Sequence, residues 1–179
     1  GSVGNSGASR QARSGYSATM WGFPYDDVDG WRGPYPPEIF AAQFEKVVRG
    51  WHDGIAELKA AAEKAPAEHR ADAASDLRLA RAAAIHFESV ANQTRFVMAR
   101  NALADTARPS SDAERAELRS EIRKAINSEM ALAKELYALS CDDSRIGFEP
   151  SCQYFYLPLD LVEKVVNCRW LLTQYADSQ

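Results

Sequence analysis

Apolar residues separated by three and four positions recur through four long stretches of the 179-residue chain. This spacing restricts the possible folds more than any other feature, because it is the period of an amphipathic helix. The first stretch places six large apolar side chains on one helical face: Phe40, Phe44, Val47, Trp51, Ile55 and Leu58. Pro36 and Pro37 suit a first helical turn, and Pro66 separates this helix from the next.

The second stretch, from about Ala67 to Leu103, is apolar on two sides. One wide face holds Leu79, Ala80, Ala83, Ala84, Phe87, Val90, Ala91, Val97 and Met98, and an opposite ridge holds Ile85, Phe96 and Leu103. A helix that is apolar on two sides is typically covered on both. We therefore expect this helix to be central.

Two further helices follow. Ser111 and Glu114 have the spacing of a capping box, which predicts the start of the third helix. Its inner face would hold Leu118, Ile122, Ala125, Glu129, Leu132, Leu136 and Leu139. The fourth helix should run from near Pro158 to about Tyr175, with Leu161, Val162, Val165, Val166, Cys168 and Leu172 inward. With at most a short hairpin near Gln153–Tyr156, the sequence predicts an all-α protein, an antiparallel bundle of about four helices with aromatic-rich, non-helical flanks.

Alanine and the aromatic residues are unevenly distributed. Of 30 alanines, 26 lie between Ala41 and Ala138, whereas 9 of the 18 aromatic residues lie in two windows, 21–35 and 148–156. Residues 1–20 are rich in Gly and Ser, a composition typical of a flexible tail or linker. We expect residues 21–179 to form a single helical domain.

The composition excludes several classes. A formal charge of -4 argues against a dedicated nucleic-acid-binding protein. No apolar run approaches the roughly 18 residues of a membrane span, and no signal peptide opens the chain, so we expect a soluble protein. The three cysteines, Cys141, Cys152 and Cys168, lack the spacing of a zinc site or a disulfide scaffold. We expect no cofactor.

One polar stripe crosses the apolar second helix. It consists of Arg81, Glu88, Asn92 and Arg95, and Glu129 takes a core position of the third helix. A carboxylate buried alone is costly, so it needs a partner, for which we expect Arg95. The stripe is either a structural ion-pair network that fixes helix register or a small-ligand site. In the second case, Glu129 and Glu88 beside Arg95 could carry proton chemistry.

Other catalytic and metal-binding patterns are missing from the sequence. His52, His69 and His86 lack the glutamate three residues earlier that a di-iron bundle requires, so we expect no metal site and place these histidines at the surface or at an interface. The acidic cluster near Asp27 does not match an EF-hand, and turn capping by Asp side chains explains it better. No histidine follows residue 86 to activate a cysteine nucleophile.

The aromatic flanks are the candidate substrate-rim or interface residues. They comprise Trp21, Tyr25, Asp27, Trp31, Arg32, Tyr35, Arg145, Glu149, Tyr154 and Tyr156. Aromatic rings beside carboxylates and arginines suit sugar recognition, and Tyr, Trp and Arg are also enriched where proteins dock. These loops could alternatively cap the open end of the bundle.

Three blocks of the sequence carry a resemblance to a known family. They read YDDVDGWRGPYPPEIFAAQFEKVVRGW (25–51), HFESVANQTRFVMARNAL (86–103) and DDSRIGFEPSCQYFYLPLDLVEKVVNCRWLL (142–172). In this order they resemble the helical C-terminal region of large bacterial glycoside-hydrolase-like proteins. The resemblance implies a catalytic domain, typically a barrel, upstream of such a region.

The third block departs from the family pattern E-A-S-N-H-Y-F-Y-T-P. Glu149, Ser151, Tyr154, Phe155, Tyr156 and Pro158 match, whereas Pro150, Cys152, Gln153 and Leu157 depart. The missing histidine puts an acid–base role for this loop in doubt, and Leu157 removes a Thr helix cap.

Two functions follow as hypotheses. In the first, the chain is a helical accessory domain of a carbohydrate-active bacterial protein. This domain packs on the catalytic domain and lends residues such as Arg145, Glu149 and Tyr154 to the rim of its sugar site. In the second, it is a stand-alone interaction module that docks on a partner subunit through residues 21–35.

Overall fold

The computed structural model describes residues 27–107, 110–149 and 154–176, with the backbone alone at positions 31, 148, 149, 154 and 155. The predicted tail, residues 1–20, lies outside this part of the chain, as do Trp21 and Tyr25. Apart from one hairpin of two-residue strands, the regular elements of the described residues are helices. The all-α prediction is confirmed.

Four long helices make up most of the described chain. They are α2 (Pro37–Glu63), α3 (Arg70–Ala104), α4 (Asp112–Asp142) and α5 (Pro158–Gln174), with a 3₁₀ turn, η1 (Ala67–His69), ahead of α3. The predicted starts near Pro36, Ala67, Ser111 and Pro158 are confirmed within a few residues. The capping box also forms, because the Glu114 backbone N–H donates to Ser111 Oγ (3.2 Å) and the Ser111 N–H donates to the Glu114 carboxylate (2.8 Å).

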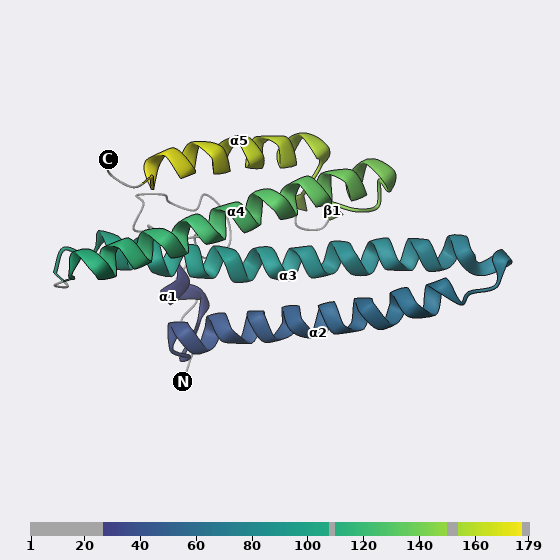
Figure 1. The fold of residues 1–179 in the computed structure, drawn as a ribbon, viewed down its shortest axis with the longest axis horizontal. Helices are drawn as coiled ribbons and strands as arrows, with labels where there is room; N and C mark the ends of the chain where they lie inside the picture. Colours follow the sequence, from purple (N-terminus) through teal and green to yellow (C-terminus); the bar gives the residue numbers. More distant parts are fainter. Residues whose placement is uncertain (1–26, 108–109, 150–153, 177–179) are drawn as a thin grey trace, which may run out of the picture.

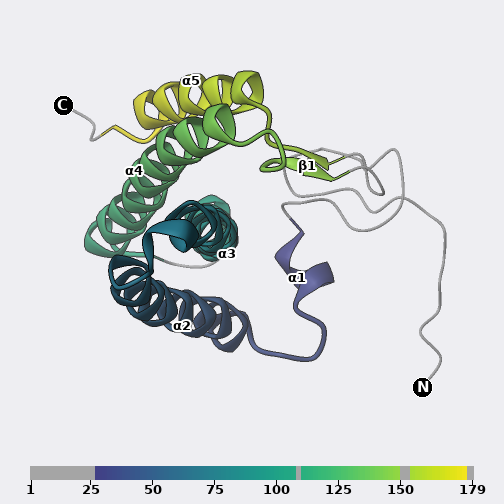
Figure 2. The same cartoon turned by 90° about the vertical axis from the view of Figure 1, so that its right-hand side faces the viewer.

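The helices pack in sequence order, α2 against α3, α3 against α4 and α4 against α5. Each runs antiparallel to the one before it (Figure 1). The view along the helices shows α2 and α4 on different sides of α3, and α5 beyond α4 (Figure 2). This arrangement explains why the sequence of α3 is apolar on two sides.

The core lies mainly between α3, α4 and α5. One cluster joins Ile85 of α3, Leu132, Ala133 and Leu136 of α4, Ile146, and Leu161 of α5; a second joins Ala99, Ile122, Ile126 and Cys168. In α2, Ala41 is the buried residue. Helix α2 therefore rests on α3 through half-exposed side chains.

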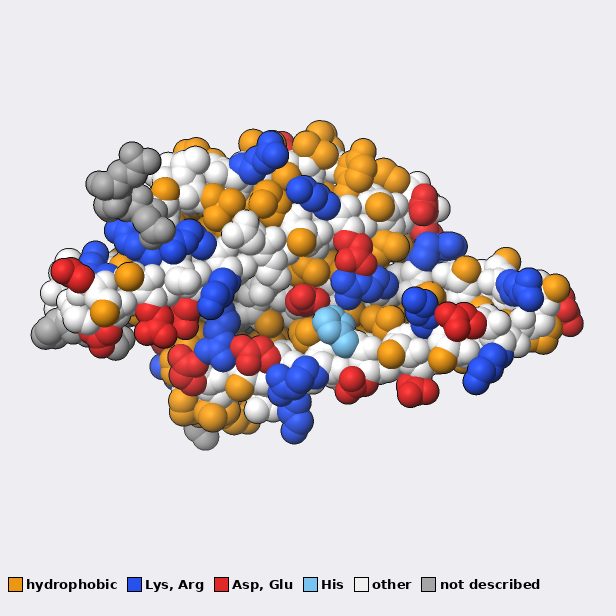
Figure 3. All heavy atoms as spheres, viewed as in Figure 1, with side chains coloured by type: hydrophobic (Ala, Val, Ile, Leu, Met, Phe, Trp, Pro, Cys, Tyr) orange, Lys and Arg blue, Asp and Glu red, His pale blue; other side chains and the backbone are white. Residues whose placement is uncertain are grey.

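The outer face of α5 corrects one prediction. Val162 and Val166, expected inward, are 47% and 62% exposed. At 100° per residue they lie roughly 100–160° around the helix from Leu161 and Cys168, which are buried. The apolar run of α5 has two faces, and packing against α4 covers only one of them. In the space-filling view, hydrophobic side chains line the α5 edge of the molecule (Figure 3).

The flanks contain some regular structure. One helical turn, α1 (Val28–Trp31), lies within the flank that was predicted to be non-helical. The Asp27 carboxylate accepts from the Gly30 N–H at 3.1 Å, which confirms its capping role. Strands β1 (Phe148–Glu149) and β2 (Tyr154–Phe155) pair antiparallel, forming the short hairpin expected near Tyr156.

Candidate functional site

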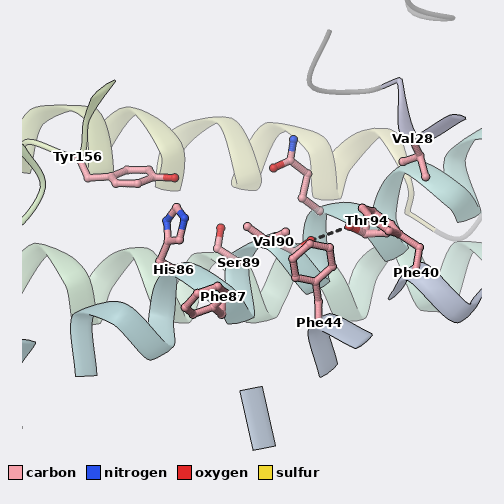
Figure 4. Close-up of a pocket in the computed structure, with 10 residues that line it drawn as sticks. Val28, Phe40, Phe44, His86, Phe87, Ser89, Val90, Thr94 and Tyr156 are labelled. Carbon is pink, nitrogen blue, oxygen red and sulfur yellow. Dashed lines mark hydrogen bonds between the residues drawn. The ribbon is translucent and has the colours of Figure 1, made fainter. Parts of the chain in front are cut away.

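An aromatic-walled groove of about 430 Å³ runs along one side of α3, with one residue from each flank in its lining. Its lining combines Val28 of α1, Phe40 and Phe44 of α2, six α3 residues (His86, Phe87, Ser89, Val90, Gln93 and Thr94) and Tyr156 beyond β2. Figure 4 shows Tyr156 and His86 at one end and the two α2 phenylalanines at the other. Segments more than 120 residues apart, at Val28 and Tyr156, thus contribute to one site.

Ring contacts fix the walls of the groove. Phe40 and Phe44, one helical turn apart on α2, meet edge to face with ring centroids 5.1 Å apart. Phe87 stacks on Trp51 of α2 at 6.1 Å and 22°. Thr94 Oγ1 donates to the Val90 carbonyl at 2.8 Å, so its hydroxyl is satisfied by the α3 backbone. Most of the surface offered to a ligand is consequently apolar.

His86 gives one end of the groove a polar group. Its ring meets Tyr156 (6.1 Å) and Phe87 (5.8 Å) edge to face. Burial lowers the pKa of His86 below its usual 6.5, and the nearby Lys164 ammonium lowers this pKa further. The imidazole is therefore neutral at pH 7, with one nitrogen that donates and one that accepts.

The lowered pKa of His86 makes folding stability depend on pH. The imidazole of the unfolded chain protonates as the pH falls through about 6.5, whereas the folded one protonates only at lower pH. The contribution of neutral His86 to folding stability is therefore complete above about pH 6.5 and is lost as the pH falls below it. We expect the free energy of unfolding to decrease as the pH is lowered from about 7.5 to about 5.5, and to decrease less in the His86→Gln variant. Urea denaturation at both pH values measures this. Equal losses in the two proteins would contradict it.

Ser89 connects the groove to a polar cluster between α3, α4 and α5. Its Oγ donates to Glu129 (2.8 Å) and accepts from Lys164 Nζ (3.1 Å). Lys164 pairs with Glu129 at 2.5 Å, and Asn92 Nδ2 donates to the other Glu129 oxygen at 3.0 Å. Lys164 also lies 6.0 Å from the centre of the Tyr156 ring. The cluster therefore holds α5 against the other two helices.

The predicted Arg95–Glu129 pair is wrong. Arg95 points toward α2, where it binds Glu45 (2.7 Å) and Glu38, and Lys164 of α5 takes the place expected for it. Both acidic partners of Arg95 lie on the polar side of α2, which the apolar pattern did not address. Hydrogen bonding to Glu45, opposed by burial and reinforced by Glu38, raises the pKa of Arg95.

The other charged residues of the polar stripe on α3 bind separate partners. Arg81 of α3 binds Glu135 of α4 through two bonds of 2.5 and 2.7 Å. This pairing lowers the pKa of Glu135 and raises that of Arg81. Glu88 contacts His52 of α2 at 3.2 Å. These contacts tie α3 to both neighbouring helices, and the structure places no two carboxylates of the stripe in one pocket.

The flank candidates fall into separate groups. Near α1, Arg32 donates to Asp29 (2.8 Å) and to the Tyr35 carbonyl (2.7 Å), and the Tyr35 side chain is 59% exposed. Tyr156 lines the groove. The side chains of Trp31, Glu149 and Tyr154 lie outside the described residues, and the backbone pairs Glu149 with Tyr154.

Arg145 has a local structural role. Its guanidinium binds Asp143 (Nε–Oδ1 2.9 Å) and reaches Ser75 near the start of α3 (2.9 Å). The paired guanidinium holds the pKa of Asp143 well below its usual range. Arg145 is thus engaged at the turn after α4, away from the α1 end of the groove.

In the described part of the chain, no group of three His, Cys, Asp or Glu side chains is arranged to hold a metal ion. His52 and His69 are exposed, whereas His86 is half-buried in the groove. Within the same residues, every helix is too short or too polar to span a membrane.

Sequence reasoning missed most of the groove. The spacing of Phe40, Phe44 and Phe87 predicts only that they lie at helix interfaces, and the sequence places His86 at the surface or at an interface. A histidine next to Phe87 within an apolar helix is the available signal in the sequence, but it does not show which face stays open.

Comparisons of this chain with protein-family models, with curated proteins and with solved structures find no match.

Proposed function

We propose that this chain is a helical accessory domain of a carbohydrate-active, glycoside-hydrolase-like bacterial protein. Its four long helices form an antiparallel bundle that packs on a catalytic domain. The groove on α3 lies at the rim of the sugar site and contacts the substrate. The sequence blocks at 25–51, 86–103 and 142–172 supply the family resemblance, and each of them contributes residues to the groove.

One observation carries the proposal, the convergence of residues from all three sequence blocks on a single groove. Val28 belongs to the first block, Phe87 and His86 to the second, and Tyr156 to the third. Chain segments distant in sequence that converge on one concave surface are typical of a binding site. A volume of about 430 Å³ falls within the range of small-ligand pockets.

The chemistry of the groove fits a sugar ring. Phe40, Phe44 and Phe87 offer apolar surface to the C–H faces of a pyranose. At one end, the neutral His86 imidazole and the Tyr156 hydroxyl can hydrogen-bond to sugar hydroxyls. Because the walls are largely apolar, we expect weak binding by this chain alone and stronger binding where a catalytic domain supplies more polar partners.

Oligosaccharide titration of the chain tests the proposal. We expect cello-, xylo- or manno-oligosaccharides to shift amide signals of groove residues in ¹⁵N–¹H spectra. Phe87→Leu should weaken binding by roughly tenfold, which corresponds to about 1.4 kcal/mol, because it removes a flat aromatic face. Tyr137→Ala, an exposed aromatic position on α4, is the matched control and should bind normally. The absence of shifts with all three sugars, or shifts confined to other surfaces, would contradict sugar contact at the groove.

A second measurement addresses the accessory role. In the protein encoded by the complete reading frame, His86→Gln should lower kcat/KM for a glycoside while Tyr137→Ala leaves it unchanged. Unchanged kinetics in both variants would limit the groove to a structural role.

A further inference from the structure

Helix α5 presents an apolar stripe to solvent. Leu159, Val162, Val166 and Trp170 are 70%, 47%, 62% and 57% exposed. Their spacing of three, four and four residues places them within about a quarter turn of one helical face. The opposite face, with Leu161 and Cys168, is buried against α4 and α3. A helix that already has a core face thus carries a second apolar face.

The position of α5 leaves this face accessible. Helix α5 is the last helix of the array and lies at the edge of the molecule in both ribbon views (Figures 1 and 2). The groove, by contrast, is bounded by α1, α2, α3 and Tyr156, and the four residues of the stripe are not among those that line it. Contiguous exposed apolar surface on a soluble protein commonly marks an interface.

The stripe is complementary to itself when one copy is turned antiparallel to another. With a two-fold axis at Val166, a residue a given number of positions before Val166 faces the residue equally far after it in the second copy. Val162 therefore meets Trp170, and Leu159 meets Thr173. The layers on either side of the axis then pair a large side chain with a smaller one, and Val166 meets its own copy on the axis. A parallel pair would instead set Trp170 against Trp170 and leave a gap between the valines.

The charges beside the stripe are compatible with this pairing. Glu163 and Arg169 are exposed on opposite edges of it, and no charged residue lies between Leu159 and Trp170 on the apolar face itself. In an antiparallel two-fold pair each edge meets the same edge of the other copy. Glu163 then lies beside Asn167 and Trp170 of the second copy, so like charges do not face each other.

We propose that the outer face of α5 binds a second copy of this chain, forming an antiparallel helix pair about a two-fold axis at Val166. The contact is small, because four side chains per copy cover less than the roughly 800 Å² per partner of a standard interface. We therefore expect a reversible dimer with a dissociation constant in the micromolar range.

Sedimentation velocity over a micromolar concentration series tests the proposal. The chain should shift from monomer to dimer, and Val166→Asp should weaken dimerisation at least tenfold, because it places two carboxylates on the axis. Val47→Asp, at an exposed apolar position of α2, is the matched control and should dimerise normally. Circular dichroism checks that both variants fold. A chain that stays monomeric at every concentration, or a dimer that Val166→Asp leaves intact, would overturn the proposal.

Cysteine cross-linking tests the geometry separately. In a Cys141→Ser, Cys152→Ser background, Val166→Cys should form an intermolecular disulfide under mild oxidation, since this residue meets itself on the axis. Leu159→Cys should cross-link only in a chain that also carries Thr173→Cys. A disulfide formed as readily by Leu159→Cys alone would overturn the antiparallel arrangement.

Discussion

Replacing Gly147 with alanine is expected to lower the free energy of unfolding by about 3 kcal/mol. Gly147 has φ +90°, a conformation that side-chain-bearing residues rarely adopt. A Cβ there would also lie far inside van der Waals contact with the carbonyl group of Tyr156. The same two residues share a backbone hydrogen bond from Tyr156 N to Gly147 O of 2.6 Å, so the chain cannot separate them without breaking it.

Gly33 provides the matched control for this substitution. It also has a positive φ, +56°, but a Cβ there would meet no atom within 4 Å. Gly33→Ala should therefore cost only about 1 kcal/mol, the backbone part of the effect. Urea denaturation of both variants compares the two values. Equal losses would show that contact with Tyr156 contributes nothing. Because Tyr156 lines the groove, Gly147→Ala should also weaken any ligand that binds there.

Replacing Glu129 with alanine is expected to lower the free energy of unfolding by about 2 kcal/mol. The Glu129 side chain is only 13% exposed and accepts hydrogen bonds from Ser89, Asn92 and Lys164. Its removal leaves the Lys164 ammonium, itself 30% exposed, beside half-buried polar groups with no counter-charge. The expected cost lies below that of a fully buried pair because water reaches the lysine.

A paired replacement separates a structural from a functional role for Glu129. Glu129→Leu combined with Lys164→Met removes both charges, and replacement of a buried ion pair by apolar residues is often neutral. We expect the double variant to recover most of the stability lost in Glu129→Ala, as measured by thermal and urea unfolding. If it stays as unstable as Glu129→Ala, the hydrogen bonds to Ser89 and Asn92 account for the loss. Oligosaccharide binding retained in the double variant would support a purely structural role.

The sequence was sufficient for the helices because their determinants are local. The apolar period, the Ser111–Glu114 capping box and the prolines at positions 36, 66 and 158 each act within a few residues. The helix starts consequently agree with the structure.

Partners and exposed faces depend on tertiary packing and were harder to predict. Glu129 could pair with a cation on either neighbouring helix, and no spacing rule distinguishes Arg95 from Lys164. In α5 the apolar residues cover more than half of the helix circumference, so the sequence does not show that Val162 and Val166 face outward. The groove also requires a residue from each flank on one side of α3, which depends on how the chain enters α2 and folds back after α4.

The small buried apolar surface of α2 has a consequence for the groove. Among the long helices, this helix packs mainly against α3 and buries only Ala41, while the main core clusters join α3, α4 and α5. Cooperative units of a protein open in order of their buried apolar contacts, so α2 should undergo sub-global opening more readily than the other three helices. Since Phe40 and Phe44 belong to α2, we expect the width of the groove to vary with the opening of this helix, so that the site adjusts to its ligand without disturbing the core.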